Sequence, residues 1–176
     1  MHEQKGSPKK HNFLLLGPSG SGKTTLGHAL AEHLGYVFIE GDDHHPASNI
    51  EKMRTGLPLT DEDRAPWLAS IGRAIAAQKE KGRPAVISCS ALKASYRELL
   101  KTFDSDLIFI CLSASKTTLE RRLQEREHFM PSSLVADQLQ IFEPPNDGIA
   151  VNNEQAIEKV LQEIFNKLAT QEEGRP

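Results

Sequence analysis

The stretch "GPSGSGKT" occupies residues 17–24 and is the most informative part of the sequence. Its spacing matches the P-loop pattern, with Gly17, Gly22, Lys23 and Thr24 at the defining positions, and the apolar run "FLLL" stands just before it. Glycines let the backbone curl so that successive N–H groups face a phosphate, and the start of the following helix adds positive potential. A chance match in a Gly/Ser-rich loop is the weaker explanation, because strand, spacing and helix pattern occur together. We therefore expect the chain to bind a nucleoside triphosphate.

The P-loop also predicts individual contacts with the nucleotide. Lys23 is expected to reach the β- and γ-phosphates, and the Thr24 hydroxyl to ligate Mg²⁺. The full set of residues predicted to bind the nucleotide is Gly17, Ser19, Gly20, Ser21, Gly22, Lys23, Thr24 and Thr25.

Composition predicts one ordinary soluble domain. The chain has 176 residues, 38% of them hydrophobic and 26% charged, and its net charge of -3 disfavours broad nucleic-acid binding. No apolar run reaches the roughly 18 residues that span a bilayer, and no signal-type segment follows the N-terminus. Cys89 and Cys111 lie in apolar runs, which predicts buried free thiols and a reducing, cytoplasmic location. We expect a mobile tail over 1–11, a domain over 12–170 and a frayed end over 171–176.

Short apolar runs alternate with amphipathic stretches along the chain. Because the runs are mostly apolar throughout, they are typical of strands covered on both faces in a parallel sheet. The pattern predicts a three-layer α/β domain with a five-stranded, mainly parallel sheet. The candidate strands are residues 13–16, 37–39, 85–88, 107–112 and 149–151.

Helix starts are predicted from capping and first-turn residues. Pro66 suits the first turn of a helix that carries Trp67, and Ser115 can cap the next-to-last predicted helix. Asn152 or Asn153 is expected to cap the last one.

A second polar run, "IEGDDHHP" (39–46), follows the second candidate strand. Ligands of open α/β sheets gather at the carboxyl ends of the strands, so this run is expected to face the P-loop. A zinc site is the weaker alternative, because His44 and His45 are adjacent and no remote Cys/His pair completes a ligand set. A solvated turn is the other alternative. Acceptor binding is the favoured interpretation.

Several classes of P-loop protein remain to be separated. A GTP-dependent switch would carry DxxG and NKxD-type motifs, and we find neither. A non-catalytic nucleotide-binding regulator is a further alternative, but it needs no acceptor-side acid and no arginine-bearing lid. A small-molecule kinase accounts for the acidic run and for the arginines near residue 122.

Four stretches together resemble the gluconokinase family, which phosphorylates D-gluconate: "GDDHHP", "NIEKMRTGLPLTDEDRAPWL", "CSALKASYRELL" and "HFMPSSLVADQ". The resemblance covers about residues 13–145, and residues 41–68 are its most specific part. It implies an adenylate-kinase-like P-loop kinase fold with a helical lid, ATP with Mg²⁺, and phosphate transfer to the 6-hydroxyl of gluconate. It is also compatible with a homodimer. A shikimate-like or nucleoside monophosphate kinase is the runner-up.

The resemblance assigns roles to the acidic run. Asp42 is expected to orient the acceptor hydroxyl, since phosphoryl transfer is largely dissociative and needs little early proton removal. Glu40, expected on the same side of an extended chain, would hold Mg²⁺ through water. Asp43 should point away, and His44 should lie at the surface. His45 is expected to shape the sugar-acid pocket.

Cationic residues are expected to bind the gluconate carboxylate and the transferred phosphate. In the acceptor segment (about 41–68), Arg64 is the favoured carboxylate ligand, with Asp61 and Asp63 holding it in place. Trp67 is expected to anchor the core.

In the lid (about 122–142), arginines are expected to meet the transferring phosphate. Glu127 stands where the family usually has glycine. The other residues predicted to bind the acceptor or the transferred phosphate are Lys52, Arg54, Ser90, Lys93, Arg97, Arg122, Arg126 and His128. Lys93 and Arg97 are expected on one helical face.

Overall fold

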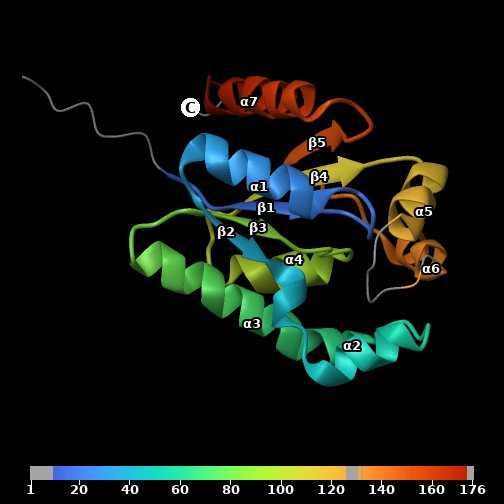
Figure 1. Ribbon diagram of the computed structural model, residues 1–176. Coiled ribbons are helices and arrows are strands. Elements are labelled where there is room, and N and C mark those ends of the chain that lie inside the picture. The colour runs from blue at the N-terminus through green and yellow to red at the C-terminus, as the bar shows by residue number, and fades with distance from the viewer. Residues whose placement is uncertain (1–9, 126–130, 132, 174–176) are drawn as a thin grey trace, which may run out of the picture.

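The computed structural model describes residues 10–125, 131 and 133–173 (Figure 1). Helices and strands alternate along this part of the chain, as the sequence predicts. The elements are β1 (Phe13–Leu16), α1 (Lys23–Leu34), β2 (Val37–Glu40), the 3₁₀ helix η1 (Gly41–His44), α2 (Ala47–Arg54), α3 (Asp61–Glu80), β3 (Ala85–Ser88), α4 (Ala94–Lys101), β4 (Ile108–Ser113), α5 (Lys116–Gln124), α6 (Leu134–Ile141), β5 (Ile149–Asn152) and α7 (Ile157–Glu173).

The five strands form one sheet in the order β2-β3-β1-β4-β5, and every neighbouring pair is parallel. The predicted strands are confirmed to within a residue at each end. In the register, both Leu15 of β1 and Glu40 of β2 align with Ser88 of β3. The carboxyl ends of these three strands are therefore level, so the segments that follow them meet at one edge of the sheet.

Helices cover both faces of the sheet, which gives the predicted three layers. In Figure 1, α1 and α7 lie on one face, and α3 and α4 lie on the other. Leu15 packs with Leu26 and Leu30 on the α1 side, whereas Leu14 packs with Ile71 on the α3 side. Because successive side chains of a strand point to opposite faces, a strand covered twice is apolar at every position.

Two predicted helix starts are wrong, and one is confirmed. Helix α3 begins at Asp61, because Thr60 and Asp63 form a reciprocal capping box, and Pro66 therefore lies inside the helix. Asn152 and Asn153 precede α7 by several residues and do not cap it. Ser115 caps α5 by accepting a hydrogen bond from the backbone N–H of Thr118.

Both cysteines are free and buried, as predicted. Burial raises the pKa of the Cys89 thiol to about 12, so this thiol stays protonated at neutral pH. Across the ranges given above, no helix is both long and apolar enough to cross a bilayer. The predicted tails fall largely on residues 1–9 and 174–176, which lie outside the described residues.

A buried polar network fixes the amino-terminal edge of the sheet. The Asn12 side chain accepts a hydrogen bond from Ala85 N at 2.7 Å and donates one to the Asp104 carboxylate at 2.8 Å. The Asn12 carbonyl also accepts from Ile108 N at 3.0 Å. Lys79, near the end of α3, forms an ion pair with Asp104. Through its side chain and its backbone carbonyl, Asn12 thus sets the relative positions of β1, β3 and β4.

We predict that Asn12→Ala lowers the free energy of unfolding by about 2–6 kcal/mol, since two buried groups lose their partner at roughly 1–3 kcal/mol each. Urea denaturation measures the change. Asn166→Ala, on the exposed side of α7, is the matched control and should stay within about 0.5 kcal/mol of the parent. Equal effects of the two substitutions would contradict the role of Asn12.

Candidate active site

The P-loop connects β1 to α1 through backbone conformations that need glycine. Gly17, Gly20 and Gly22 have φ angles of 144°, 83° and 91°. A Cβ on Gly17 would come within 2.6 Å of the Leu112 carbonyl oxygen, so the close approach of β4 also excludes a side chain there. The result is a tight loop at the sheet edge that has room for an anion but not for extra side chains.

The loop already contacts oxygen atoms of the protein. The Ser19 N–H donates to the Gln138 side-chain oxygen at 2.7 Å, and the Lys23 ammonium donates to the carbonyls of Gly17 and Pro18 at 2.9 and 3.0 Å. The buried Ser21 hydroxyl lacks a hydrogen-bond partner in the described ranges. Ser21 does not line the cavity, whereas Ser19 and Lys23 do, and an N–H and an ammonium group so placed fit the phosphates of a nucleotide.

Glu40 links the P-loop helix to the acidic turn. Its carboxylate accepts hydrogen bonds from the Thr24 hydroxyl at 2.6 Å, from the Ser88 hydroxyl and from Asp42 N at 3.3 Å. The expectation of an extended chain after Glu40 is wrong, because residues 41–44 form η1. The carboxylates of Glu40 and Asp42 nevertheless both line the cavity. The Asp42 N–H donates to the Glu40 side chain, which keeps the two residues together. Asp43 is exposed, and half-buried His44 contacts Ser70.

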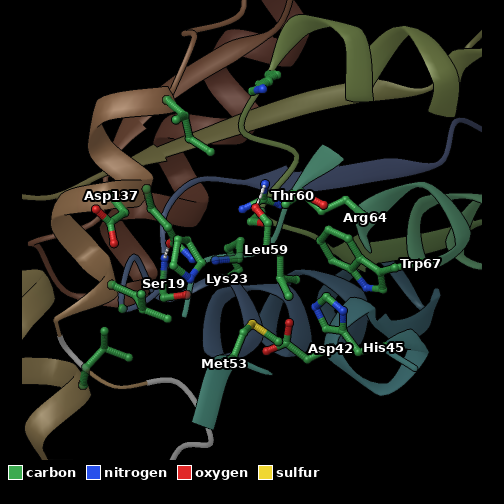
Figure 2. A pocket seen from close by; sticks show the side chains of 18 of the residues that line it. Ser19, Lys23, Asp42, His45, Met53, Leu59, Thr60, Arg64, Trp67 and Asp137 are labelled. Atoms are coloured by element: carbon green, nitrogen blue, oxygen red, sulfur yellow. Dashed lines mark hydrogen bonds between the residues drawn. The ribbon is translucent and has the colours of Figure 1, made fainter. Parts of the chain in front are cut away.

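One cavity of about 490 Å³ joins the two halves of the site. Figure 2 shows Ser19 and Lys23 on one side of it and Asp42, His45 and Trp67 on the other. Both halves lie at the carboxyl edge of the sheet because the strands that precede them end level with each other. The cavity is therefore the place where a nucleotide and an acceptor could meet.

His45 is held against the core. Its ring stacks on that of Trp67 at a centroid distance of 4.1 Å, and the buried Trp67 donates its indole N–H to the Gly41 carbonyl at 2.8 Å. Burial, opposed by the charge of Asp42 and helped by Arg64 and His44, lowers the pKa of His45 to about 4. The imidazole is thus uncharged at neutral pH and offers hydrogen bonds rather than positive charge.

Two of the cations predicted for the acceptor side, Arg64 and Lys93, line the cavity, and Ser90 lines it as well. Arg64 is buried and donates to the Leu59 carbonyl at 2.6 Å and to the Tyr96 hydroxyl at 3.3 Å. Lys93 forms an ion pair with Asp61 at 2.8 Å. The acceptor side of the cavity therefore carries positive charge in addition to the carboxylates near the P-loop.

Three of the cations predicted for the acceptor side do not line the cavity. Lys52 pairs with Asp63 at 2.5 Å, and Arg54 is exposed at the end of α2. Arg97 is buried and donates to the Ala91 and Glu143 carbonyls at 2.8 and 2.7 Å, so it holds a turn together.

Two predicted relationships between side chains are also wrong. Lys93 precedes α4 as its N-cap and does not share a helical face with Arg97. Asp61 and Asp63 hydrogen-bond to lysines, and Arg64 is held by Leu59 and Tyr96 instead.

The segment predicted as the lid, about 122–142, includes the end of α5 and all of α6. Arg122 donates to the Gly20 and Asn153 carbonyls at 3.3 and 2.6 Å, so it contacts the P-loop without lining the cavity. Leu134 of α6 packs with Met53 and Leu59 of the acceptor segment and so covers one side of the cavity. The predicted Arg126 and His128 lie outside the described residues.

Sequence reasoning missed several residues of the site. Asn153 donates to the Ser21 carbonyl at 2.7 Å and so supports the P-loop. Asn153 directly follows the fifth strand, at the edge of the sheet where ligands bind, and this position could have indicated a role in the site. We instead interpreted it as a helix cap. Asp137 and Gln138 line the cavity from α6, and no spacing in the sequence pointed to them. Tyr96 lies behind the two cations.

Comparison with known proteins places the chain in a family. A family model described as "AAA domain" matches residues 13–145. The chain is 46% identical over 168 residues to the gluconokinase of Gluconobacter oxydans, covering 93% of this chain and 94% of that protein. The structure of a gluconokinase from Sinorhizobium meliloti matches with a TM-score of 0.81 and 44% identity, over 92% and 93% of the two chains.

A more distant structure matches in fold alone. The shikimate kinase of Aquifex aeolicus is 21% identical with a TM-score of 0.60, covering 93% of this chain and 99% of that one. The gluconokinases, in contrast, share more than a third of their residues with this chain over nearly its whole length. The chain belongs to the gluconokinase family.

Proposed function

We propose that this protein transfers the γ-phosphoryl group of ATP to the 6-hydroxyl of D-gluconate, giving 6-phospho-D-gluconate and ADP. The observation that carries the proposal is one cavity of about 490 Å³ that is lined by the P-loop, by carboxylates and by cations. The gluconokinases to which the chain is similar support the choice of acceptor.

The nucleotide end of the cavity fits ATP with Mg²⁺. Thr24 and Glu40 offer the oxygen atoms that Mg²⁺ prefers, with phosphates and water completing its coordination. When bound, the ion neutralises charge on the phosphates. Lys23 is proposed to leave the carbonyls of its own loop and bind the β- and γ-phosphates. Arg122 steadies the loop through the Gly20 carbonyl.

The acceptor end fits a polyol acid. Arg64 and Lys93 are proposed to bind the carboxylate of gluconate, since their N–H groups match an anionic oxygen pair. The uncharged His45 ring and the Ser90 hydroxyl are placed to hydrogen-bond the sugar hydroxyls. Asp42 is proposed to orient the 6-hydroxyl in line with the γ-phosphate and to accept its proton late in the transfer.

The site argues against the other functions considered. A regulator that only binds nucleotide has no use for Asp42 or for buried Arg64 in the same cavity. A shikimate-like kinase would also need cations for a carboxylate. The resemblance of residues 41–68 and the similarity to gluconokinases favour gluconate over that acceptor.

The first prediction concerns acceptor choice. A coupled ADP-release assay across gluconate, shikimate, glycerate and nucleoside monophosphates should show kcat/KM for gluconate at least about a hundredfold above the others, a difference of roughly 2.7 kcal/mol in transition-state binding. A flat profile would count against gluconate as the substrate.

The second prediction concerns Asp42. Asp42→Asn should lower kcat by about a hundredfold or more and leave the KM for ATP within about twofold, because only acceptor orientation and proton acceptance are lost. Steady-state kinetics with ATP varied at saturating gluconate measures both values. The exposed neighbour provides the control: Asp43→Asn should behave like the parent. Near-normal turnover of Asp42→Asn would remove its assigned role.

The third prediction concerns Glu40. Glu40→Gln should raise the Mg²⁺ concentration that gives half-maximal activity about tenfold, since an outer-sphere carboxylate is lost. A titration of Mg²⁺ at fixed ATP measures the shift. Glu51→Gln, on the exposed side of α2, should leave it unchanged. If Glu40→Gln lowered activity equally at every Mg²⁺ concentration, Glu40 would be a structural residue only.

A further inference from the structure

Tyr96 lies behind the wall of the acceptor site. It belongs to the first turn of α4, is 6% exposed and does not line the cavity. Its hydroxyl donates to the Asp61 carboxylate and accepts from Arg64 Nη1 at 3.3 Å. Asp61 in turn accepts from Lys93 at 2.8 and 3.0 Å. One hydroxyl thus connects three charged side chains that do line the cavity.

The ring of Tyr96 also lies next to both cations. The Arg64 guanidinium carbon and the Lys93 ammonium nitrogen are 5.7 and 5.6 Å from the ring centroid. An aromatic face attracts cations, so the ring and Asp61 together offset the repulsion between the two positive charges. Burial, with help from the Asp61 hydrogen bond, raises the pKa of Tyr96. The hydroxyl therefore stays protonated and keeps its donor and acceptor roles at neutral pH.

We propose that Tyr96 is a positioning residue that fixes Arg64, Asp61 and Lys93 in the arrangement that selects a carboxylate-bearing polyol. This inference rests on the proposed function, because the carboxylate in question is that of the acceptor. Two long cationic side chains would otherwise sample many rotamers, and ordering them on binding would weaken affinity. Held in advance by one hydroxyl and one ring, they present a fixed pair of donors.

Tyr96→Phe tests the proposal, since it removes the hydroxyl and keeps the ring. Gluconate is compared with glucitol, which has the same carbon chain but a CH₂OH group in place of the carboxylate. We expect the KM for gluconate to rise about tenfold, with the KM for ATP and kcat within about twofold, and the preference for gluconate over glucitol to fall by a similar factor.

The chain offers a matched control, because it contains only two tyrosines. Tyr36, at the far side of the sheet against Phe13, should tolerate Tyr36→Phe without kinetic change. If the parent phosphorylates gluconate and Tyr96→Phe behaves like Tyr36→Phe, the inference fails and the proposed function stands. If the parent does not phosphorylate gluconate, the proposed function itself fails.

A second measurement decides the matter even if Tyr96→Phe does not fold. In the Tyr36→Phe variant labelled with 3-fluorotyrosine, Tyr96 gives the one fluorine resonance of the protein. With a non-hydrolysable ATP analogue present, saturating gluconate should shift this resonance, and glucitol at the same concentration should not. A resonance that gluconate leaves unchanged would overturn the proposal.

Discussion

The hydrogen bonds to the Glu40 carboxylate bring the parts of the site together. Three donors converge on it: the Thr24 hydroxyl from the first turn of α1, the Ser88 hydroxyl from the end of β3 and the backbone N–H of Asp42. Each comes from a different segment of the chain, and all meet at the carboxyl edge of the sheet. Hydrogen bonds to a charged group are worth about 1.5–3 kcal/mol each, so this carboxylate couples the P-loop, the third strand and the acidic turn.

The same convergence constrains the residues around it. A Cβ on Gly41 would lie 2.0 Å from the Ser88 carbonyl oxygen, so the turn after β2 approaches β3 only because residue 41 is glycine. The Gly41 carbonyl then accepts the Trp67 indole N–H, and Trp67 stacks on His45. The positions of Trp67 and His45, on the proposed acceptor side of the cavity, therefore depend on one close contact between the turn after β2 and the end of β3.

The sequence predicted the strands and the P-loop well, but it predicted poorly which side chains pair with each other. Strands and the P-loop follow from local periodicity and spacing. The meeting of residues 17–24 and 39–46 was predictable because ligands of open α/β sheets gather at the carboxyl ends of the strands. Which lysine pairs with which aspartate depends on tertiary packing, so Lys52, Asp61 and Arg97 were misjudged. Asn153 and Gln138 touch the P-loop from more than a hundred residues away, and local patterns carry no trace of such contacts.

The distribution of charge in the cavity explains why the hydroxyl farthest from the carboxylate would be the one phosphorylated. In the proposed binding mode, Glu40 and Asp42 would repel the acceptor carboxylate, whereas Arg64 and Lys93 would attract it. A six-carbon acid bound this way would extend from the cations towards Asp42, so its terminal hydroxyl would face the transferring phosphate. Reversing the acid would place its charge against two carboxylates in a partly desolvated cavity, where like charges cost several kcal/mol. In that binding mode, electrostatic orientation would supply regioselectivity before any hydroxyl-specific contact forms.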